Sequence, residues 1–317
     1  MSSSPIVIKD SHRMIVFTVM DYIEEHLSEK LTLHKLSELV SYSPFHFHRL
    51  FKAVTDESLN DYVKRTRLEH AMKKIALNPN RSLSEISDEC GFSSIADFSR
   101  SFKNYFGINA SQFKESTTDK NRKICEMDRK ITERYFNTTY YNRTYPDSTT
   151  RVETIRSLKV SVKQLPAHRV IYDRCLGSID PYSDQERIMQ AFDKVSAWTR
   201  TRQNQVFQSF QIGIPYQLPF ESRNLIGWRY DACRTIPSNI GNDLGINSRW
   251  LAGGTYAVIQ LENDPKVRTF ILDIFLHDWL PSTGYVVDGR PFLELFSVSD
   301  VRNAVYKDLC IPITELH

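Results

Sequence analysis

The feature that most constrains this chain is an internal repeat in its first third. Residues 36–52 resemble residues 86–103, with an offset of 50 up to a central turn and of 51 after it. The second offset pairs Phe47 with Phe98, so the second copy has one more residue at the start of its latter helix. Self-similarity at such a period predicts that one supersecondary unit is used twice.

Each copy is predicted to form a short helix, a tight turn and a longer helix, because apolar residues recur at helical spacing. Gly91 suits a residue of positive φ after a helix, whereas Ser41, at the matching place of the first copy, suits it less well. Each longer helix combines an apolar stripe with a polar face, as the reading of a major groove requires. The stripes are Phe47, Leu50, Phe51 and Phe98, Phe102, Phe106, and the polar faces are His48, Arg49, Lys52 and Ser99, Arg100, Lys103.

The connector between the copies favours DNA binding over the alternative, an all-α domain with a duplicated helical hairpin that binds no nucleic acid. Residues 58–77 have helical spacing, and about 20 residues at a rise of ~1.5 Å span about 30 Å. One turn of B-DNA is about 34 Å long, so two reading helices on this rod would enter successive major grooves. Charge adds little, because residues 11–115 carry 14 Lys and Arg against 14 Asp and Glu, with local basic clusters such as Lys64/Arg65/Arg67.

The second copy carries the motif that most specifically resembles a known family, the AraC/XylS transcription regulators. The resemblance covers about 105 residues, with Ser41 and Asp56 in place of usual glycines and Ala110 in place of a usual proline. Its carriers are Gly91-Phe92, then Phe98-x-Arg100-x-Phe102-Lys103-x-x-Phe106-Gly107, then Phe113-Lys114.

The resemblance implies a tandem helix-turn-helix domain over residues 11–116 whose second helices meet bases in double-stranded DNA. Arg49 would grip a guanine through O6 and N7, and the apolar Ile95 and Ala96 would make methyl or van der Waals contacts. Asp97 would read a cytosine amine or cap its helix, and capping is the favoured interpretation. The predicted DNA-facing set is Phe45, His48, Arg49 and Lys52 in the first copy, and Ile95, Ala96, Asp97, Ser99, Arg100 and Lys103 in the second.

The second half of the chain changes to strands mixed with two helices. Residues 117–154 form a predicted linker, the start of which extends as a charged helix to about residue 136. From residue 155 to 317 a β-α-β-β order occurs twice, which predicts one α+β domain with a cleft at a pseudo-two-fold seam. The predicted strands are 160–166, 169–175, 210–215, 227–236, 256–261, 292–296 and 309–313, and the predicted helices are 183–202 and 265–280.

This half resembles the gyrase-inhibitor-like (GyrI-like) effector domain of several multidrug-type regulators. The resemblance implies that the domain binds an apolar or cationic small molecule, with Glu294 as the counter-charge inside an aromatic pocket. The segment 214–220 lacks the acidic residues common there, so the ligand class is open. The carriers are Leu165-Pro166, Arg169-Val170, Ile212-Gly213, Tyr230-Asp231-Ala232-Cys233, Gly253-Gly254-x-Tyr256-Ala257, Trp279-Leu-Pro-x-x-Gly-Tyr285, Pro291-x-x-Glu294 and Ile311-Pro312.

Glu294 also stands out on physical grounds. It interrupts an otherwise apolar strand, and a buried carboxylate is costly unless it is paired. The alternative to a ligand role is a side chain that points to solvent or pairs with a nearby arginine. The aromatic side chains predicted to contact the ligand beside it, by cation–π and stacking contact, are Tyr172, Trp228, Tyr230, Tyr256 and Phe296.

The fold class predicted for the whole is multi-domain: an all-α tandem helix-turn-helix (homeodomain-like) domain followed by an α+β duplicated β-α-β-β GyrI-like domain. Five scattered cysteines, no apolar run of membrane length and no secretory leader predict a cytoplasmic protein. We find no catalytic constellation, metal cluster or cofactor motif, so the expected function is a ligand-modulated transcription regulator. Its partners would be DNA, a small-molecule effector and RNA polymerase; the alternative is a GyrI-like hydrolase or a ligand-sequestering protein fused to a DNA-binding domain.

Overall fold

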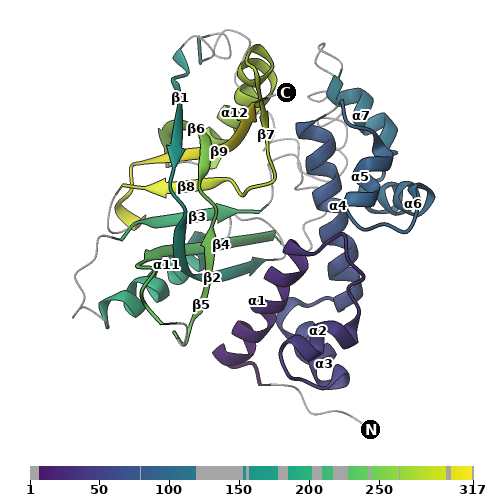
Figure 1. Cartoon of the computed structure of the whole chain (residues 1–317). Helices are drawn as coiled ribbons and strands as arrows, with labels where there is room; N and C mark the ends of the chain where they lie inside the picture. The colour runs from purple at the N-terminus through teal and green to yellow at the C-terminus, as the bar shows by residue number, and fades with distance from the viewer. Residues whose placement is uncertain are drawn as a thin grey trace. The chain divides into compact units, whose positions relative to one another are not determined.

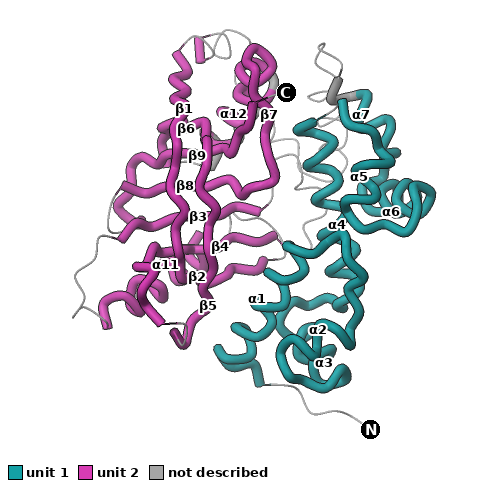
Figure 2. The backbone as a smooth tube through the Cα atoms, in the orientation of Figure 1, with its two compact units in different colours: residues 1–124 teal, residues 125–317 magenta. Residues whose placement is uncertain are grey.

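The computed structural model consists of two compact units, residues 1–124 and 125–317 (Figure 2). The predicted charged helix, from the start of the linker to about residue 136, falls beyond residue 118 on residues that lie outside the described part of the chain. The described residues are 7–78, 80–118, 153–154, 157–177, 185–201, 209–216, 228–241, 244–263, 265–297 and 301–315.

The first unit is helical in all its described elements (Figure 1). The repeat appears as two short–long helix pairs, and the 19-residue helix α4 connects them and begins after its N-cap, Ser58. The helical spacing of the sequence predicts the two pairs and the connecting helix correctly, whereas it gives no prediction for α1 and α7. The bounds of the helices are α1 Asp10–Glu25, α2 Leu33–Leu39, α3 Pro44–Thr55, α4 Leu59–Leu77, α5 Leu83–Glu89, α6 Ile95–Phe106 and α7 Ala110–Thr118.

The two copies place different residues at matching left-handed positions. Residues 40–43 separate α2 from α3, whereas residues 90–94 separate α5 from α6, so the extra residue predicted at the start of the second long helix lies in the turn instead. The helices α3 and α6 have 12 residues each. Ser41 takes φ 56° where the second copy has Gly91 at 75°, and Asp56 takes φ 63° where the second copy has Gly107 at 72°. A left-handed backbone is strained for a residue with a Cβ. The poor fit of Ser41 seen in the sequence therefore does not change the turn, because the packed helices on both sides impose its conformation.

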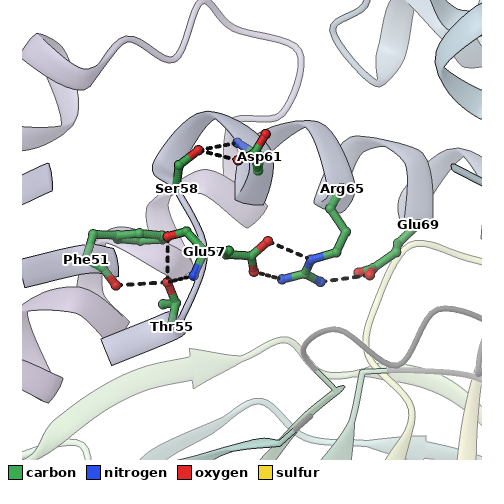
Figure 3. Close-up of polar contacts among 7 residues, drawn as sticks. All are labelled: Phe51, Thr55, Glu57, Ser58, Asp61, Arg65 and Glu69. Atoms are coloured by element: carbon green, nitrogen blue, oxygen red, sulfur yellow. Dashed lines mark hydrogen bonds and ion pairs between the residues drawn. The ribbon is translucent and has the colours of Figure 1, made fainter. Parts of the chain in front are cut away.

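The joint between α3 and α4 rests on a buried group of ions (Figure 3). The guanidinium of Arg65 contacts both carboxylate oxygens of Glu57, with an Nη2–Oε1 distance of 2.5 Å, and bonds to Glu69 at 2.8 Å. Burial opposes the charge of Arg65, but the two carboxylates hold its pKa well above the usual value. Thr55 adds a hydroxyl bond to the carbonyl of Phe51 at 2.8 Å, which closes the end of α3.

The sequence suggests a local basic cluster of Lys64, Arg65 and Arg67, but the structure does not place these three side chains together on the surface. Arg65 is buried in ion pairs, and Arg67 donates to the carbonyls of Leu27 at 3.0 Å and Glu29 at 2.7 Å. Of the three cations, Lys64 is the exposed one. The helical period of α4 explains this result, since side chains that are adjacent in sequence point in different directions around the axis.

The second unit is built on an antiparallel sheet with strand order β1-β6-β9-β8-β3-β4-β2-β5, and β7 pairs with β9. The sheet contains the predicted repeat as β2-α11-β3-β4 and β6-α12-β8-β9, which meet where β3 pairs with β8. The fold class predicted from the sequence is confirmed. The strands are β1 Val160–Leu165, β2 His168–Gly177, β3 Gln211–Pro215, β4 Trp228–Ile236, β5 Asn247–Leu251, β6 Gly254–Glu262, β7 Tyr285–Val287, β8 Leu293–Phe296 and β9 Tyr306–Glu315.

Helix α11, Gln185–Arg200, and helix α12, Pro265–Ile274, contact the sheet at β2 and β4 and at β6. Side chains of α11 form a buried core with β2 and β4, in which Phe192 contacts the rings of Tyr230 and Phe296. α12 continues into a π-helical turn, Phe275–Trp279, and a 3-10 turn, Leu280–Ser282. Strands β5 and β7 are absent from the sequence prediction, which is wrong at these two places.

Candidate nucleic-acid interface and ligand site

The reading helices α3 and α6 begin at matched serine caps. The hydroxyl of Ser43 accepts a bond from the backbone N–H of His46 at 3.3 Å, and that of Ser94 accepts from Asp97 at 3.1 Å. Such caps satisfy backbone donors that the first turn of a helix leaves without partners. The predicted apolar stripes of both helices are buried, so the rest of each helix surface faces outward.

The structure brings all four predicted DNA-facing residues of the first copy, and four of the six of the second, to one side of their helix. Positions 45, 48, 49 and 52 share a face of α3, and positions 96, 99, 100 and 103 share a face of α6, at spacings of three or four residues. Phe45, Lys52, Ile95, Ala96, Ser99, Arg100 and Lys103 are exposed, and His48, Arg49 and Asp97 are half-buried.

The capping interpretation of Asp97 is wrong, because Ser94 is the cap. Asp97 is instead the third residue of the helix, where its carboxylate accepts hydroxyl bonds from Ser93 at 3.3 Å and Ser101 at 3.5 Å. A carboxylate in the first turn is also favoured by the helix dipole. These contacts give Asp97 a structural role within the motif.

Glu294 is 3% exposed and lies at the seam between the two β-α-β-β repeats, paired with Gly213. Its Oε1 accepts from Lys307 Nζ at 2.9 Å and from Arg268 Nη1 at 3.1 Å, and its Oε2 accepts from the Tyr230 hydroxyl at 2.9 Å. Burial alone would raise its pKa, but Lys307 and Arg268 lower the pKa of Glu294 to about 2. Pairing with a nearby arginine, the alternative left open by the sequence, is thus present together with a lysine.

Gly213 makes this arrangement possible. A Cβ at position 213 would lie 1.8 Å from the Tyr230 hydroxyl oxygen and 3.3 Å from Glu294 Oε2. Any side chain there would separate the hydroxyl from the carboxylate. The glycine is therefore part of the Glu294 group, and sequence analysis noted it only as a carrier of the family resemblance.

The structure separates the six predicted ligand residues onto two faces of the sheet. Side chains alternate between the two faces of the sheet along a strand. Tyr172 pairs with Cys233 and shares its face, whereas Tyr230, three residues from Cys233 on β4, lies on the other face. In the same way, Tyr256 pairs with Pro312, whereas Glu294 pairs with Leu309, three residues away on β9. Glu294, Trp228, Tyr230 and Phe296 share the face that carries α11, and Tyr172 and Tyr256 lie on the other.

The opposite face holds a second buried carboxylate, Asp231. Arg174 bonds both of its oxygens, at 2.7 and 2.8 Å, and Arg249 and the Tyr216 hydroxyl contact Oδ2 at 2.6 and 2.8 Å. Burial opposes ionisation, but the two arginines lower the pKa of Asp231. Both guanidiniums also lie over the ring of Tyr172, about 5 Å from its centroid.

Sequence reasoning missed the cations of both groups. Lys307, Arg268, Arg174 and Arg249 come from different elements, and no spacing rule links them to Glu294 or Asp231. Within the described residues, no group of three or more His, Cys, Asp or Glu side chains is placed to hold a metal ion. None of the described helices combines the length and the apolar character needed to cross a bilayer.

Comparison with known proteins agrees with both halves of the fold. Residues 36–116 match the family described as "Helix-turn-helix domain", and residues 158–314 match the "GyrI-like small molecule binding domain". The multiple antibiotic resistance protein MarA of Escherichia coli is 28% identical over 106 residues, 33% of this chain and 83% of MarA. The bifunctional transcriptional activator/DNA repair enzyme AdaA of Bacillus subtilis is 31% identical over 97 residues, 31% of this chain and 46% of AdaA.

Among solved structures, the C-terminal domain of AraT, a response regulator from Geobacillus stearothermophilus, is similar with a TM-score of 0.31 and 27% identity. The likeness covers 32% of this chain and 84% of that one. The fold and the family matches together define a two-domain DNA-binding transcription regulator. It carries an AraC-type helix-turn-helix domain followed by a GyrI-like small-molecule binding domain, the combination of a ligand-modulated regulator.

Proposed function

We propose that the chain reads DNA sequence through α3 and α6 and that a small molecule bound in the second unit modulates this binding. The observation that carries the proposal is the equivalence of the two reading faces. The offset of 51 pairs Arg49 with Arg100 and Lys52 with Lys103, and both pairs lie on the outward faces of capped helices. The arginines would read bases, and the lysines would contact phosphates.

The first test compares a base-reading residue with a phosphate-contacting one. Arg49→Ala is expected to weaken binding to the specific site by about 1–3 kcal/mol and to relax the preference at one base pair. Lys64→Ala, on the exposed side of α4, is expected to weaken binding to all sequences alike and to lower the salt dependence. Gel-shift titrations of the full chain measure both. Unchanged operator affinity of Arg49→Ala would contradict this docking.

For the effector, we propose a site on the face of the sheet that holds Glu294, with Tyr230, Phe296 and Trp228 as its aromatic neighbours. Tyr172 and Tyr256, on the other face, cannot contact the same side of such a ligand. The charges around Glu294 favour an uncharged apolar effector over a cationic one. A cation at this carboxylate would have to replace Lys307 or Arg268, each of which is already bound to it.

A thermal-shift screen tests the effector's charge with a lipophilic cation, an uncharged aromatic compound of similar size and a bile-salt-like acid. We expect the uncharged compound to raise the Tm of the wild type, and the cation to leave it unchanged. Glu294→Gln is compared with Lys307→Met, which retains the length of the side chain without its charge. A cation that stabilises the wild type and not Glu294→Gln would make Glu294 the counter-charge after all.

We propose further that the chain acts in the cytoplasm, contacts RNA polymerase and performs no catalysis. The relative AdaA supports this, since its name includes a transcriptional activator, and the repair activity in that name belongs to a protein matched over 46% of its length. A stabilising compound provides the test. Its addition should change transcription from the chain's operator, whereas turnover of the compound would favour the hydrolase alternative.

A further inference from the structure

The two helix-turn-helix motifs touch each other directly, in addition to the connection that α4 makes between α1–α3 and α5–α7 (Figure 1). Gly91, in the turn of the second motif, lies against the loop that follows α1, since a Cβ on it would be 2.1 Å from the carbonyl oxygen of Leu27. Arg67, near the middle of α4, reaches the same loop. Its Nε donates to the Leu27 carbonyl at 3.0 Å and its Nη2 to the Glu29 carbonyl at 2.7 Å. These four residues form the Arg67 joint.

The loop in this joint is fixed to the first motif. The backbone N–H of Glu29 donates to the His26 carbonyl at 2.9 Å, which closes a turn, and its carboxylate accepts from Lys35 Nζ on α2 at 2.5 Å. The side chain of Leu27 is buried. The two carbonyls that Arg67 holds therefore move together with α2 and with α3, which packs against α2.

The other side of the joint belongs to the second motif. The position of a Cβ on Gly91 lies 2.8 Å from Arg67 Nη2, so the guanidinium packs directly against the turn. Burial lowers the pKa of Arg67, whereas Cys90 in that turn and Asp97 in the first turn of α6 oppose the shift. The half-buried guanidinium therefore bonds to the loop of the first motif and packs against the turn of the second.

A second connection of this kind fixes the angle between the motifs. Helix α4 by itself sets their separation, because its 19 residues span about 28 Å at ~1.5 Å per residue. Two motifs joined by one helix alone still swing as that helix bends. The Arg67 joint closes a ring of contacts across α4, and such a swing would break the hydrogen bonds of Arg67 to the loop.

We propose that Arg67 is the positioning residue that fixes the angle between α3 and α6, so that the chain accepts operators with one spacing between their two major-groove segments. One extra base pair moves the second segment by about 3.4 Å and turns it by about 35° around the DNA axis. A rigid pair of motifs cannot follow this displacement, whereas a pair released at Arg67 can. The inference rests on the proposed reading of DNA by α3 and α6.

The experiment varies the spacing within the operator. A site is selected from random duplexes with the full chain, and one base pair is then inserted or removed between its two segments. The wild type should lose at least about tenfold in affinity at each altered spacing, the cost of about one mismatched base pair. Arg67→Met keeps the length of the side chain without its donors, and it should lose about threefold or less, because both segments stay in contact. Fluorescence anisotropy titrations measure the affinities.

Lys64→Met is the matched control, because it removes the same charge from the exposed side of α4. It should weaken binding at every spacing by one factor and keep the wild-type ratios. Arg67→Lys keeps the charge but loses the planar fork that holds both carbonyls, so it should widen the accepted spacing as Arg67→Met does. Circular dichroism verifies folding, and Arg67→Lys carries the test if Arg67→Met does not fold.

The outcomes separate this inference from the proposed function. Wild-type spacing ratios in every folded Arg67 variant, or a wild type that accepts the altered spacings, would overturn this inference alone. A chain that selects no sequence would overturn the proposed function with it.

Discussion

The two helix-turn-helix motifs share their left-handed positions and reach them by different means. In the second, glycines occupy the left-handed positions after α5 and α6, and in the first, Ser41 and Asp56 take the same φ values. A left-handed backbone costs a residue with a side chain about 1–2 kcal/mol. The first motif therefore carries strain that the second avoids, and the surrounding packing has to enforce its shape.

The motifs also differ in what anchors them to α4. The first is held by the buried ion group of Arg65 with Glu57 and Glu69. The second packs closely at Gly91, where a Cβ would lie 2.1 Å from the carbonyl oxygen of Leu27, which follows α1, and 2.8 Å from the guanidinium of Arg67 on α4. Ion pairs hold the first motif, and a close backbone approach that only glycine permits holds the second. Each anchor can be removed separately.

The largest effect is expected from Arg65→Ala. The substitution leaves two carboxylates in the interior without their cation, and breaking a buried ion pair in this way costs about 3–5 kcal/mol. Urea unfolding followed by far-ultraviolet circular dichroism measures the loss in the helical unit. Lys64→Ala, one position earlier and exposed, is the control and should change the free energy of unfolding by less than about 0.5 kcal/mol. A loss below about 1 kcal/mol in Arg65→Ala would remove the ion group as the anchor of the first motif.

Gly91→Ala should have the next largest effect. It adds the left-handed penalty of about 1–2 kcal/mol and forces the Leu27 carbonyl away, so a total of about 2–3 kcal/mol is expected. Ser41→Ala changes the equivalent turn, where a Cβ is already accommodated, and should cost less than about 0.5 kcal/mol. Thermal unfolding of the two variants side by side measures the difference. Equal shifts in Tm would show that the turns are anchored alike.

The elements that sequence predicts well are those whose signals are local. Helix α6 has a serine cap, a three-phenylalanine stripe and a terminal glycine, all within its own length. Strand β5, Asn247–Leu251, has no such signal, because its residues are mixed in polarity and its extended shape comes from pairing with β2. The site divides in the same way. Glu294 is conspicuous in an apolar strand, but Lys307, from β9, reaches it only through the sheet register.

The same dependence on register explains why only some of the aromatic residues predicted to contact the ligand lie on the same face of the sheet as Glu294. Tyr230 and Tyr256 both sit in apolar strands, and alternation alone cannot decide which faces of two different strands coincide. Pairing decides it, and it puts them on opposite sides of the sheet. By contrast, the DNA-facing residues lie on two helices of known period, so their common face follows from spacing without any knowledge of the tertiary contacts.

The smallest effect expected distinguishes strain from loss of contacts. Asp56→Gly gives the first motif the residue that the second has at Gly107, and relief of the left-handed penalty exceeds the entropy cost of glycine by about 0.5 kcal/mol. The reciprocal change, Gly107→Ala, meets no atom within 4 Å, so it should lose only the conformational term of about 1 kcal/mol. A stabilised Asp56→Gly and a destabilised Gly107→Ala, measured by urea unfolding, would establish that the two turns differ in strain and share one required shape. If Asp56→Gly were instead destabilised, the Asp56 side chain would contribute contacts that outweigh its strained backbone.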